Sequence, residues 1–463
     1  MIGVYIYMNN IPVEKNKEYI VNIIDNGYEG EGIAKIDNYT IFIPGAIKGE
    51  KVKILIVKVN SSHSFGKIID ILEKSKARVE SDCNTYKRCG GCNLRHMNYE
   101  HTLELKRNNV QNLIDKTLKQ KVKVKDTIGM EKPFFYRNKA QYPVGYDKNG
   151  EIVTGVYAER SHEIIEQTSC AIQMPISTQI AKFIITFMKE NKISAYNEKT
   201  GKGAIRHIVI KVGLSTNEVM CILVTNERKI KNEEKLVENL KNNFSNIKTI
   251  VKNINQRNTN VIMGNENVIL YGNGYIQDKL GNFIFNISPL SFYQINPIQT
   301  EKLYSLAINK ANLIKEDTVL DLYCGIGTIG TFASPYVKQV YGIEIVEQAI
   351  EDAKENAKIN KIENMKFYCG DVEQVLDKVL KNEETMPNVV FVDPPRRGLD
   401  KHTIDNIINI KPQRLVYISC NPATLVRDLK ELEELYEIKE IQPVDMFPFT
   451  SHVECCSVLY LKN

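Results

Sequence analysis

The sequence predicts an α/β protein in which a small β-barrel, a mixed α/β middle region and a C-terminal parallel sheet follow one another. β-rich runs separated by glycine-containing turns occupy the stretch before Leu72. From about Asn286 onward, helices alternate with short apolar strands, a pattern typical of a parallel sheet covered on both faces. The stretch between them mixes short strands with loops. We therefore expect three domains, spanning residues 12–72, 73–285 and 286–463.

The overall composition is that of an ordinary soluble globular protein. The chain has 463 residues, of which 43% are hydrophobic and 25% charged, and this length is enough for two or three separate cores. No run of about 18 consecutive apolar residues occurs, so we expect no membrane span. Residues 1–10 lack the features of a secretory signal and suggest a disordered or strand-like lead-in. Ten cysteines suit a reducing compartment, which predicts a cytoplasmic protein.

The first domain contains β-rich runs at residues 19–24, 39–43 and 52–57, which predict a small antiparallel barrel. Small barrels often bind oligonucleotides, but they also serve as structural modules. Both functions therefore remain open for this one.

A helix is expected over residues 99–118, because apolar side chains recur there at helical spacing. The net charge of the whole chain is only +5, too small by itself to indicate a nucleic-acid partner. Between Glu100 and Ala140, however, ten Lys or Arg stand against five Asp or Glu. This excess predicts a local basic surface.

The C-terminal domain contains several short apolar runs that predict the strands of its sheet. In chain order, these are Thr318–Leu322, Val340–Ile343, Lys366–Cys369, Val389–Val392, Arg414–Ile418, Tyr436–Val444 and Glu454–Leu461. In open sheets of this kind, ligands bind at the carboxyl ends of the strands. The loops that follow these strands are therefore the first places to look for function.

A glycine-rich loop, Asp321–Gly330, follows the first of these strands and opens a predicted helix. Its spacing fits a dinucleotide-binding loop, and Glu344 after the next strand could hold a ribose hydroxyl in either cofactor class. Asp321 favours S-adenosylmethionine, whose ammonium group prefers a nearby carboxylate. Asp371 follows the third strand, where a carboxylate would contact the adenine end of the cofactor or cap a helix.

Two further strand ends carry chemistry, Asp393–Gly398 and Ser419–Pro422. A lone buried cysteine is usually inert, but Cys420 leaves a strand at the ligand-binding edge. A thiolate that adds to C6 of uracil makes C5 nucleophilic enough to accept a methyl group, and a base must then remove the C5 proton. Glu454 is the candidate base, although a surface or salt-bridged Glu is the alternative.

An ordinary thiol has a pKa of about 8.5, so Cys420 needs activation or works from a minor thiolate population. Arg396 and Arg397 fit thiolate activation, phosphate contact or structural pairing equally well.

Three cysteines stand close together in the pattern Cys83-x5-Cys89-x2-Cys92, with a glycine pair between the last two. This spacing is typical of a metal knuckle that needs a fourth ligand from elsewhere, and Cys170 is the best candidate. Four thiolates suit zinc or an iron-sulfur cluster, and the spacing leaves that choice open.

Five segments carry a family resemblance through their order along the chain: Ser291–Asn296, Asp321–Gly330, Asp393–Gly398, Ser419–Pro422 and His452–Glu454. Together they resemble the RNA uracil-5-methyltransferase family, most closely its bacterial 23S ribosomal RNA branch (RumA/RlmD-like, including the RlmCD type). The resemblance spans nearly the full chain.

The resemblance implies an N-terminal TRAM domain over residues 12–72, a central domain with an iron-sulfur cluster over 73–285, and a Rossmann-like methyltransferase domain over 286–463. The helix at 99–118 would pack with the catalytic domain. Implied ligands of a [4Fe-4S] cluster are Cys83, Cys89, Cys92 and Cys170. Implied contacts to S-adenosylmethionine are Gln294, Tyr323, Glu344, Asp371 and Asp393.

The resemblance also implies that Cys420 is the nucleophile and Glu454 the base, with a uridine of 23S rRNA as substrate. The target base is expected to flip out of its stack. The segment Phe134–Lys139 interleaves aromatic and basic residues, which suits RNA contact or a core-edge strand. Ribosomal RNA is the expected partner, with no membrane and no obligate protein partner.

Four rival functions remain. An amino-group methyltransferase would want an aromatic residue after its Asp-Pro-Pro or Asn-Pro-Pro, whereas Arg396 stands there in this chain. A transfer RNA uracil-5-methyltransferase would share Cys420 and Glu454, but the best-known branch of that kind lacks the barrel and the cysteine cluster. An NAD-dependent oxidoreductase is favoured only by the glycine loop and leaves both residues without a role. A non-catalytic RNA-binding protein would fit a degenerate cofactor site.

Overall fold

A computed structural model describes residues 11–159, 161–167, 169–382 and 386–462. The predicted lead-in, residues 1–10, lies outside this range. The chain divides into two compact units. The barrel unit contains the residues up to Tyr86 together with Gly91–Asn109 and Phe449–His452, and the sheet unit contains Lys87–Gly90, Val110–Pro448 and the residues from Val453 onward.

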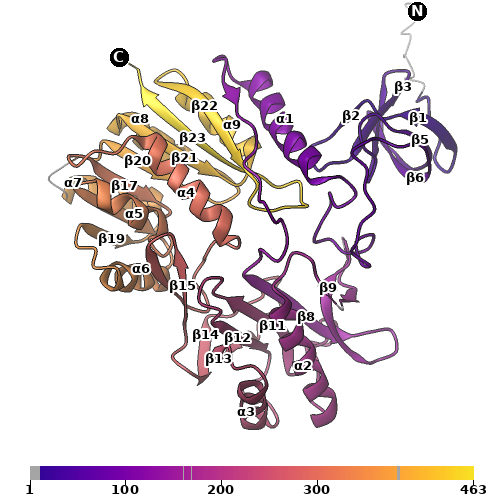
Figure 1. Cartoon of the computed structure of the whole chain (residues 1–463), viewed down its shortest axis with the longest axis horizontal. Coiled ribbons are helices and arrows are strands. Elements are labelled where there is room, and N and C mark those ends of the chain that lie inside the picture. The colour runs from indigo at the N-terminus through magenta and orange to yellow at the C-terminus, as the bar shows by residue number, and fades with distance from the viewer. Residues whose placement is uncertain (1–10, 160, 168, 383–385, 463) are drawn as a thin grey trace, which may run out of the picture. The chain divides into compact units, whose positions relative to one another are not determined.

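The barrel unit is built on one six-stranded sheet with the order β1-β5-β6-β4-β3-β2. Its strands are β1 (Glu18–Asn22), β2 (Asp25–Asn26), β3 (Gly32–Ile36), β4 (Tyr39–Ile43), β5 (Lys51–Val59) and β6 (His63–Glu73) (Figure 1). The three predicted runs overlap β1, β4 and β5. Pairing is antiparallel except between β4 and β6, which run parallel. Every second side chain along β4 and β5 points into the core, including Ile41, Ile43 and Ile54.

The predicted helix is α1 (Tyr99–Thr117), one residue shorter than expected. Its last turns belong to the sheet unit, where Val110 and Ile114 are fully buried in one core cluster with Leu320 of the C-terminal sheet. The short strand β7 (Lys123–Val124) then pairs in parallel with β22 (Tyr436–Val444) of that sheet. The three domain boundaries remain predictions.

The middle of the chain forms a seven-stranded sheet with the order β10-β9-β8-β11-β12-β13-β14. It comprises β8 (Lys139–Tyr146), β9 (Ile152–Tyr157), β10 (Ile164–Glu166), β11 (Ile205–Val212), β12 (Val219–Thr225), β13 (Ile247–Ile254) and β14 (Glu266–Tyr271), with helices α2 (Pro175–Asn191) and α3 (Glu233–Asn243). A hairpin of β15 (Ile276–Leu280) and β16 (Phe283–Ile287) follows.

The C-terminal part forms an eight-stranded sheet with the order β19-β18-β17-β20-β21-β23-β22-β7 (Figure 1). Its strands after β7 are β17 (Thr318–Leu322), β18 (Gln339–Glu344), β19 (Met365–Cys369), β20 (Val389–Val392), β21 (Arg414–Ser419), β22 and β23 (Glu454–Leu461). The helices are α4 (Pro297–Ala311), α5 (Thr328–Ala333), α6 (Glu347–Ile359), α7 (Val372–Asn382), α8 (Lys401–Ile410) and α9 (Pro422–Leu432), with a 3₁₀ turn η1 (Ser334–Tyr336). All seven predicted strands are present.

The five strands β19, β18, β17, β20 and β21 run parallel, and β23 lies antiparallel between β21 and β22. The central strand β17 is buried along its whole length and contributes to a core cluster on each face of the sheet, through Val319 on one and Leu320 on the other. Two-sided burial explains why its sequence is a continuous apolar run. Within the described residues, no helix has both the length and the apolar content needed to cross a membrane.

Candidate active site

The predicted site residues lie along one edge of the C-terminal sheet. Tyr323 directly follows β17, Asp393 follows β20 and Cys420 follows β21, while Glu344 is the last residue of β18. These four strands are parallel, so their carboxyl ends share this edge. The antiparallel strand β23 begins at the same edge with Glu454. The structure therefore gathers residues from five strands at one place.

Cys420 and Glu454 are neighbours because of strand register. Ser419 at the end of β21 pairs with Cys455 in β23, so the next residue outward on one strand is Cys420 and on the other Glu454. Cross-strand neighbours of this kind have side chains within reach of each other. The proposed nucleophile and the proposed base thus stand side by side at the edge of the sheet.

Glu454 is a buried carboxyl, only 3% exposed, and its Oε2 atom has no hydrogen-bond partner among the described residues. Burial raises the pKa of Glu454 well above its usual value, and the nearby Asp393 raises it further. The alternative of a surface Glu is therefore wrong, and no ion pair of Glu454 occurs within the part of the chain that the structure describes. A buried carboxyl with a raised pKa is a stronger base than an exposed one.

Cys420 is half-buried. Burial raises the pKa of its thiol to about 12, with Glu454 and Asp393 contributing to the rise and Arg396 opposing it. The two neighbouring carboxyl groups therefore disfavour the thiolate. Among the groups that change this pKa, Arg396 is the one whose positive charge favours the thiolate.

The glycine-rich loop links β17 to α5 with left-handed backbone at Gly325 (φ 55°) and Gly327 (φ 78°). Two carboxylates hold this loop. The Oδ2 atom of Asp321 accepts a hydrogen bond from the Gly330 N–H at 2.9 Å, and Oε2 of Glu344 accepts one from the Gly325 N–H at 3.1 Å. A Cβ at Gly330 would lie only 3.1 Å from that same Oδ2 atom, so a larger residue there would disturb the contact.

Asp321 is fully buried, and its other oxygen, Oδ1, has no described partner. Burial raises the pKa of Asp321 to about 8. An orphaned carboxyl oxygen beside a glycine loop suits a ligand that brings its own hydrogen-bond donor or positive charge.

Gln294 reaches the same edge from the segment before α4. The side chain of Asn138 donates to the backbone oxygen of Gln294 at 2.9 Å, which fixes this segment, and the Gln294 amide then donates to Oδ2 of Asp393 at 3.4 Å. Burial raises the pKa of Asp393, and this hydrogen bond partly offsets the rise. Gln294 and Asp393 are therefore brought together as predicted.

Tyr323 and Asp371 complete the predicted set. Tyr323 has a left-handed backbone (φ 64°) at the end of β17, and its hydroxyl donates to Asp400 at 3.5 Å. Asp371 is half-buried and immediately precedes α7, where a helix-capping residue would also stand. Its strand, β19, pairs with β18 up to Cys369 opposite Glu344, so Asp371 and Glu344 leave the sheet at the same edge.

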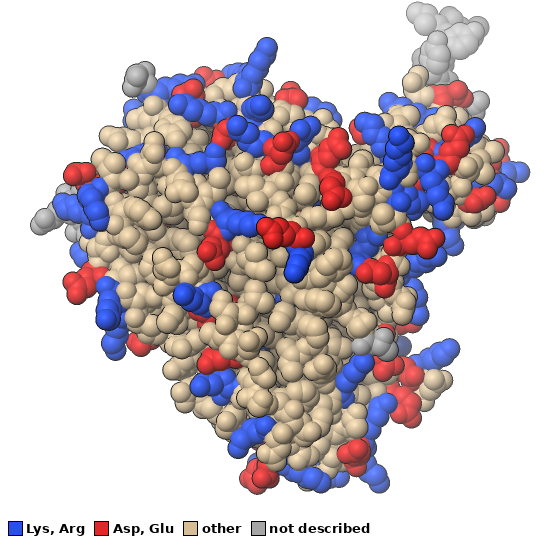
Figure 2. All heavy atoms as spheres, in the orientation of Figure 1, with Lys and Arg blue, Asp and Glu red and all other residues tan. Residues whose placement is uncertain are grey.

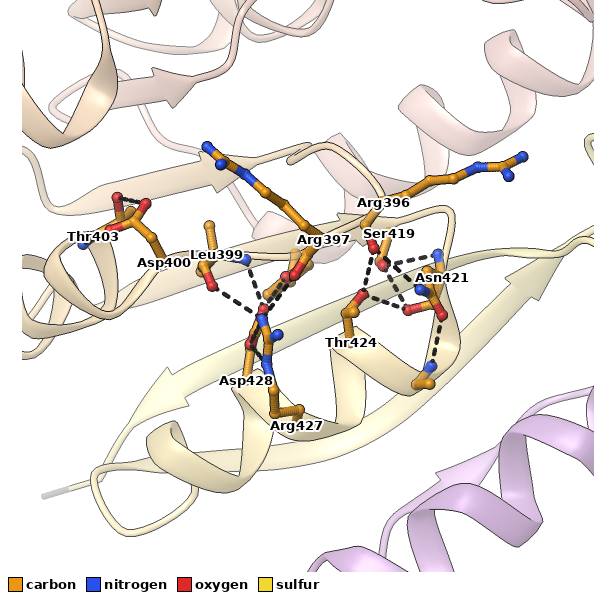
Figure 3. Close-up of polar contacts among 12 residues, drawn as sticks. Arg396, Arg397, Leu399, Asp400, Thr403, Ser419, Asn421, Thr424, Arg427 and Asp428 are labelled. Atoms are coloured by element: carbon orange, nitrogen blue, oxygen red, sulfur yellow. Dashed lines mark hydrogen bonds and ion pairs between the residues drawn. The ribbon is translucent and has the colours of Figure 1, made fainter.

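Asp428 in α9 is a structural residue of the site that no sequence motif indicated. It is fully buried and accepts hydrogen bonds from the Leu399 N–H at 2.8 Å and the Tyr417 hydroxyl at 2.6 Å. Arg427 donates to Asp428 and to the backbone oxygens of Arg397 and Leu399 (Figure 3). The loop after β20 is thereby tied to the helix after β21.

The side chains of Arg396 and Arg397 extend away from this hydrogen-bonded cluster (Figure 3). Both arginines are exposed. The Asn421 amide and the Thr424 hydroxyl hold the backbone oxygen of Arg396 at 3.1 and 3.3 Å. Neither guanidinium has an ion pair with another described residue, which argues against structural pairing and leaves thiolate activation and phosphate contact.

The four cysteines predicted to hold a cluster are all partly exposed. Cys83 and Cys92 belong to the barrel unit, whereas Cys89 and Cys170 belong to the sheet unit. Within the part of the chain that the structure describes, no three His, Cys, Asp or Glu side chains are grouped to hold a metal ion. The geometry does not support the predicted cluster.

Two family models and several curated proteins match this chain. The model of the tRNA (uracil-5-)-methyltransferase family matches residues 98–462, and the TRAM domain model matches residues 12–69. An uncharacterized RNA methyltransferase of Clostridium acetobutylicum is 49% identical, covering 96% of this chain and 97% of its own length. One of Oceanobacillus iheyensis is 44% identical, with 97% and 98% coverage.

Among solved structures, the tRNA (uracil-54, C5)-methyltransferase of Pyrococcus abyssi in complex with S-adenosyl-L-homocysteine superposes with a TM-score of 0.74 at 26% identity. The match covers 96% of this chain and all of the other. A solved enzyme named for transfer RNA therefore shares the overall architecture of this chain, and the contrast with the best-known transfer RNA branch stays a prediction. Overall architecture does not discriminate between the two RNA substrates.

Proposed function

Because the chain belongs to the tRNA (uracil-5-)-methyltransferase family of RNA methyltransferases, we propose that it transfers a methyl group from S-adenosylmethionine to C5 of a uridine in 23S rRNA. One observation carries the chemistry. The buried Glu454 carboxyl, with an oxygen that lacks a partner among the described residues, stands in strand register beside the Cys420 thiol. A thiol and a base side by side are what C5 methylation of uracil requires.

In the first step, the Cys420 thiolate adds to C6 of the uracil ring. A bond forms between Sγ and C6, and the electron pair of the C5–C6 double bond moves into the ring as an enolate. C5 of this enolate would then accept the electrophilic methyl group of S-adenosylmethionine, and the bond between that methyl group and the cofactor sulfur would break with its electron pair staying on sulfur, which leaves S-adenosylhomocysteine. Arg396, whose charge lowers the pKa of Cys420, stabilises the thiolate before addition.

In the second step, Glu454 takes the remaining proton from C5. The electrons of the C–H bond re-form the C5–C6 double bond, and the bond between Sγ and C6 breaks. The products are 5-methyluridine, a Cys420 thiolate and a protonated Glu454. The orphaned Oε2 atom is the acceptor for that proton.

The cofactor would be held by the side chains at the carboxyl edge of the sheet. We assign Glu344 to the ribose hydroxyls, Asp371 to the adenine end, and Gln294, Asp393 and Tyr323 to the remainder. The donor set fits such a ligand, because carboxylate and amide groups suit its hydroxyls and ammonium group. The unpartnered Oδ1 of Asp321 supports a cationic ligand at the loop.

Neither C5 nor C6 is reachable in a stacked base, so the target uridine would flip into the space between Cys420 and the cofactor. A structure of the RNA complex with the uridine still stacked would contradict this part of the proposal.

A [4Fe-4S] cluster on Cys83, Cys89, Cys92 and Cys170 remains a proposal from the family resemblance, and no catalytic step needs it. Both a cluster and an active thiolate suit the reducing cytoplasm, the location we propose. Iron and sulfide contents near four per chain after anaerobic purification would support the cluster. Zinc alone, or no metal, would exclude it.

The deciding experiment supplies methyl-labelled S-adenosylmethionine with 23S rRNA and, separately, with transfer RNA, and maps the labelled nucleoside. We expect label in 5-methyluridine of 23S rRNA with the wild type and none with Cys420→Ala. Label only in transfer RNA would establish the second candidate, which the whole-chain likeness to the Pyrococcus abyssi enzyme favours. Binding without methylation would indicate a non-catalytic RNA-binding protein.

A further inference from the structure

Tyr304 is a buried tyrosine that no sequence motif indicated and that no step of the proposed reaction uses. It lies in the middle of α4 and is only 2% exposed. Its ring packs edge-on against Phe332 of α5, with the ring centroids 5.6 Å apart. Phenylalanine would fill the same space, so packing explains the ring but not the hydroxyl. A hydroxyl at a buried position lowers stability unless it forms hydrogen bonds.

The hydroxyl of Tyr304 reaches two parts of the candidate cofactor site. It lies 3.4 Å from the hydroxyl of Thr328, the residue of the glycine-rich loop at which α5 begins. Burial raises the pKa of Tyr304, while hydrogen bonds with Thr328 and Gln294 oppose the rise. The phenol therefore stays protonated, so it can donate one hydrogen bond and accept another. Thr328 and Gln294 belong to different segments of the chain, and this one hydroxyl contacts both.

Two carboxyl groups lie close to the same hydroxyl, because Asp393 and Asp321 both raise the pKa of Tyr304. Figure 2 shows the Asp and Glu side chains of the visible surface interspersed with Lys and Arg. Asp393 and Asp321 differ from them, because no cationic side chain is among the groups that change their pKa values. A ligand that carries positive charge would offset these two carboxyl groups. The surroundings of Tyr304 therefore suit a cationic cofactor.

Helix α4 holds Tyr304 in a fixed place. Asn296 caps the helix, because its side chain accepts a hydrogen bond from the Gln299 N–H at 3.3 Å and donates one to the backbone oxygen of Met446 at 3.0 Å. The Gln299 amide donates to the backbone oxygen of Asp445 at 3.2 Å. Both Asn296 and Gln299 are fully buried. The first turn of α4 is therefore tied to the segment after β22, which leaves the side chains farther along the helix little freedom to move.

We propose that Tyr304 is a positioning residue for S-adenosylmethionine, and that its hydroxyl holds the Gln294 side chain and the start of α5 in the arrangement that binds the cofactor. Side chains that touch a ligand bind it best when further hydrogen bonds fix their orientation. This inference rests on the proposed function, which assigns Gln294, Asp393 and the glycine-rich loop to the cofactor. Tyr304 acts through these groups and does not need to touch the cofactor or the uridine.

Tyr304→Phe tests the role of the hydroxyl, because it keeps the ring and removes one oxygen. We expect the Kd of S-adenosylhomocysteine, measured by isothermal titration calorimetry, to rise by about fivefold to tenfold, the effect of losing one or two hydrogen bonds. The KM for S-adenosylmethionine should rise by a similar factor. The kcat at saturating cofactor and the KM for RNA should stay within about twofold of the wild type. A general loss of stability would not change the KM for one substrate alone.

Tyr460→Phe is the matched control. The Tyr460 hydroxyl donates to the backbone oxygen of Lys310 at 2.8 Å, in the last turn of the same helix. This variant also removes one tyrosine hydroxyl that contacts or belongs to α4, but at the opposite end of the helix from Asn296. We expect chemical denaturation to show a comparable loss of stability in the two variants. The Kd of S-adenosylhomocysteine should be unchanged in Tyr460→Phe.

A double-mutant cycle tests whether Tyr304 acts through its partner in α5. Thr328→Val keeps the shape of the side chain and removes its hydroxyl. If the two hydroxyls act together, Tyr304→Phe should weaken S-adenosylhomocysteine binding less when Thr328→Val is already present, because the shared contact is then already lost. Fully additive effects would overturn the proposed hold on α5.

The outcomes separate this inference from the proposed function. If the wild type methylates RNA but Tyr304→Phe binds S-adenosylhomocysteine as tightly as the wild type, or Tyr460→Phe weakens binding equally, Tyr304 does not position the cofactor and only this inference falls. A wild type that binds S-adenosylhomocysteine but methylates no uridine would overturn the proposed function alone, because the Kd of Tyr304→Phe is measured without RNA. If the wild type does neither, the proposed function falls and this inference falls with it.

Discussion

At the scale of single residues, Glu454 is defined by a carboxyl oxygen that no described donor reaches. A buried hydrogen-bond acceptor without a partner lowers the stability of the folded protein. We therefore expect this oxygen to have a function in the site. Removing the C5 proton is a use that needs the basic carboxylate and not merely the shape of the side chain. Glu454→Gln therefore separates the two steps of the reaction.

We expect Glu454→Gln to transfer the methyl group but to lose the elimination step. Turnover should fall by about 10²- to 10⁴-fold, and a covalent protein–RNA adduct should accumulate that survives denaturing electrophoresis. Adding Cys420→Ala to this variant should abolish the adduct, because no sulfur is left to bond C6. Full turnover by Glu454→Gln would refute its role as the base.

The raised pKa of the Cys420 thiol leads to a prediction about the pH dependence of activity. Burial and two carboxyl groups raise its pKa to about 12, and Arg396 opposes the rise. In the proposed mechanism only the thiolate attacks, so we expect kcat/KM to rise as pH increases through the neutral range. Removing Arg396 raises the pKa further and leaves less thiolate at any given pH.

Arg396→Ala is therefore expected to move the pH profile of kcat/KM toward higher pH. Because the thiolate fraction falls tenfold when the pKa rises by one, activity at pH 7 should drop by up to about tenfold for a displacement of the profile by one pH unit. Arg397→Ala is the matched control, since Arg397 is equally exposed but is not among the groups that change the pKa of Cys420. If both variants lose activity equally at every pH, the arginines contact phosphate and do not activate the thiol.

At the scale of elements, the site depends on the hydrogen bonds that hold the loop after β20 against helix α9. Asp428 is fully buried and joins the loop after β20 to α9 through the Leu399 N–H, the Tyr417 hydroxyl and Arg427. Each hydrogen bond to a charged group contributes about 1.5–3 kcal/mol. The position of the loop after β20 therefore depends on helix α9 as well as on the sequence of the loop.

Asp428→Ala is expected to lower the free energy of unfolding by about 3 kcal/mol or more, because it leaves buried donors unpaired. It should also reduce methylation, since the loop carries Arg396. Chemical denaturation measures the first effect. Asp405→Ala, which replaces an exposed Asp in the neighbouring helix α8, should change stability by no more than about 0.5 kcal/mol. Equal stabilities of the two variants would contradict the fastening role.

Strands buried on both faces could be predicted with their bounds. β17 and β20 have the predicted bounds, because every position in them is buried and the apolar run is unbroken. β14 is the opposite case. Its first four residues are exposed and it forms the edge of its sheet, so burial does not account for its short apolar run at Val268–Tyr271, and the sequence left this strand unassigned. The Asn- and Lys-rich middle of the chain was unclear for this reason.

Only part of the candidate site could be predicted from the sequence. Strand ends located Tyr323, Asp393 and Cys420, because parallel strands bring their carboxyl ends to one edge. The position of Glu454 depends on β23 lying between β21 and β22, a pairing between distant segments that no local pattern encodes. Its candidate role as a base came from the chemistry of a thiol adduct and from the family resemblance, whereas its position beside Cys420 in strand register came only from the structure.

At the scale of the whole molecule, the packing of the core follows the division into two units. The clusters that contain Val21 and Leu94 draw their members from the barrel unit alone. The three clusters around both faces of the C-terminal sheet and under the middle sheet draw theirs from the sheet unit alone. Separate cores are the condition for separate cooperative unfolding.

A ligand of the sheet unit should therefore stabilise that unit without stabilising the barrel. At a concentration about 100 times its Kd, S-adenosylhomocysteine should add about 2.7 kcal/mol to the unfolding free energy of the unit that binds it. The chain contains no tryptophan, so in a Phe42→Trp variant, with Phe42 in β4 of the barrel, tryptophan fluorescence reports the barrel alone, while circular dichroism reports mostly the larger unit. We expect the ligand to raise the transition seen by circular dichroism and to leave the fluorescence transition in place, and Asp393→Asn to diminish the first effect. A fluorescence transition that rises together with the other would mean that the two units unfold as one, because binding energy gained at the carboxyl edge of the sheet would then be shared with the barrel.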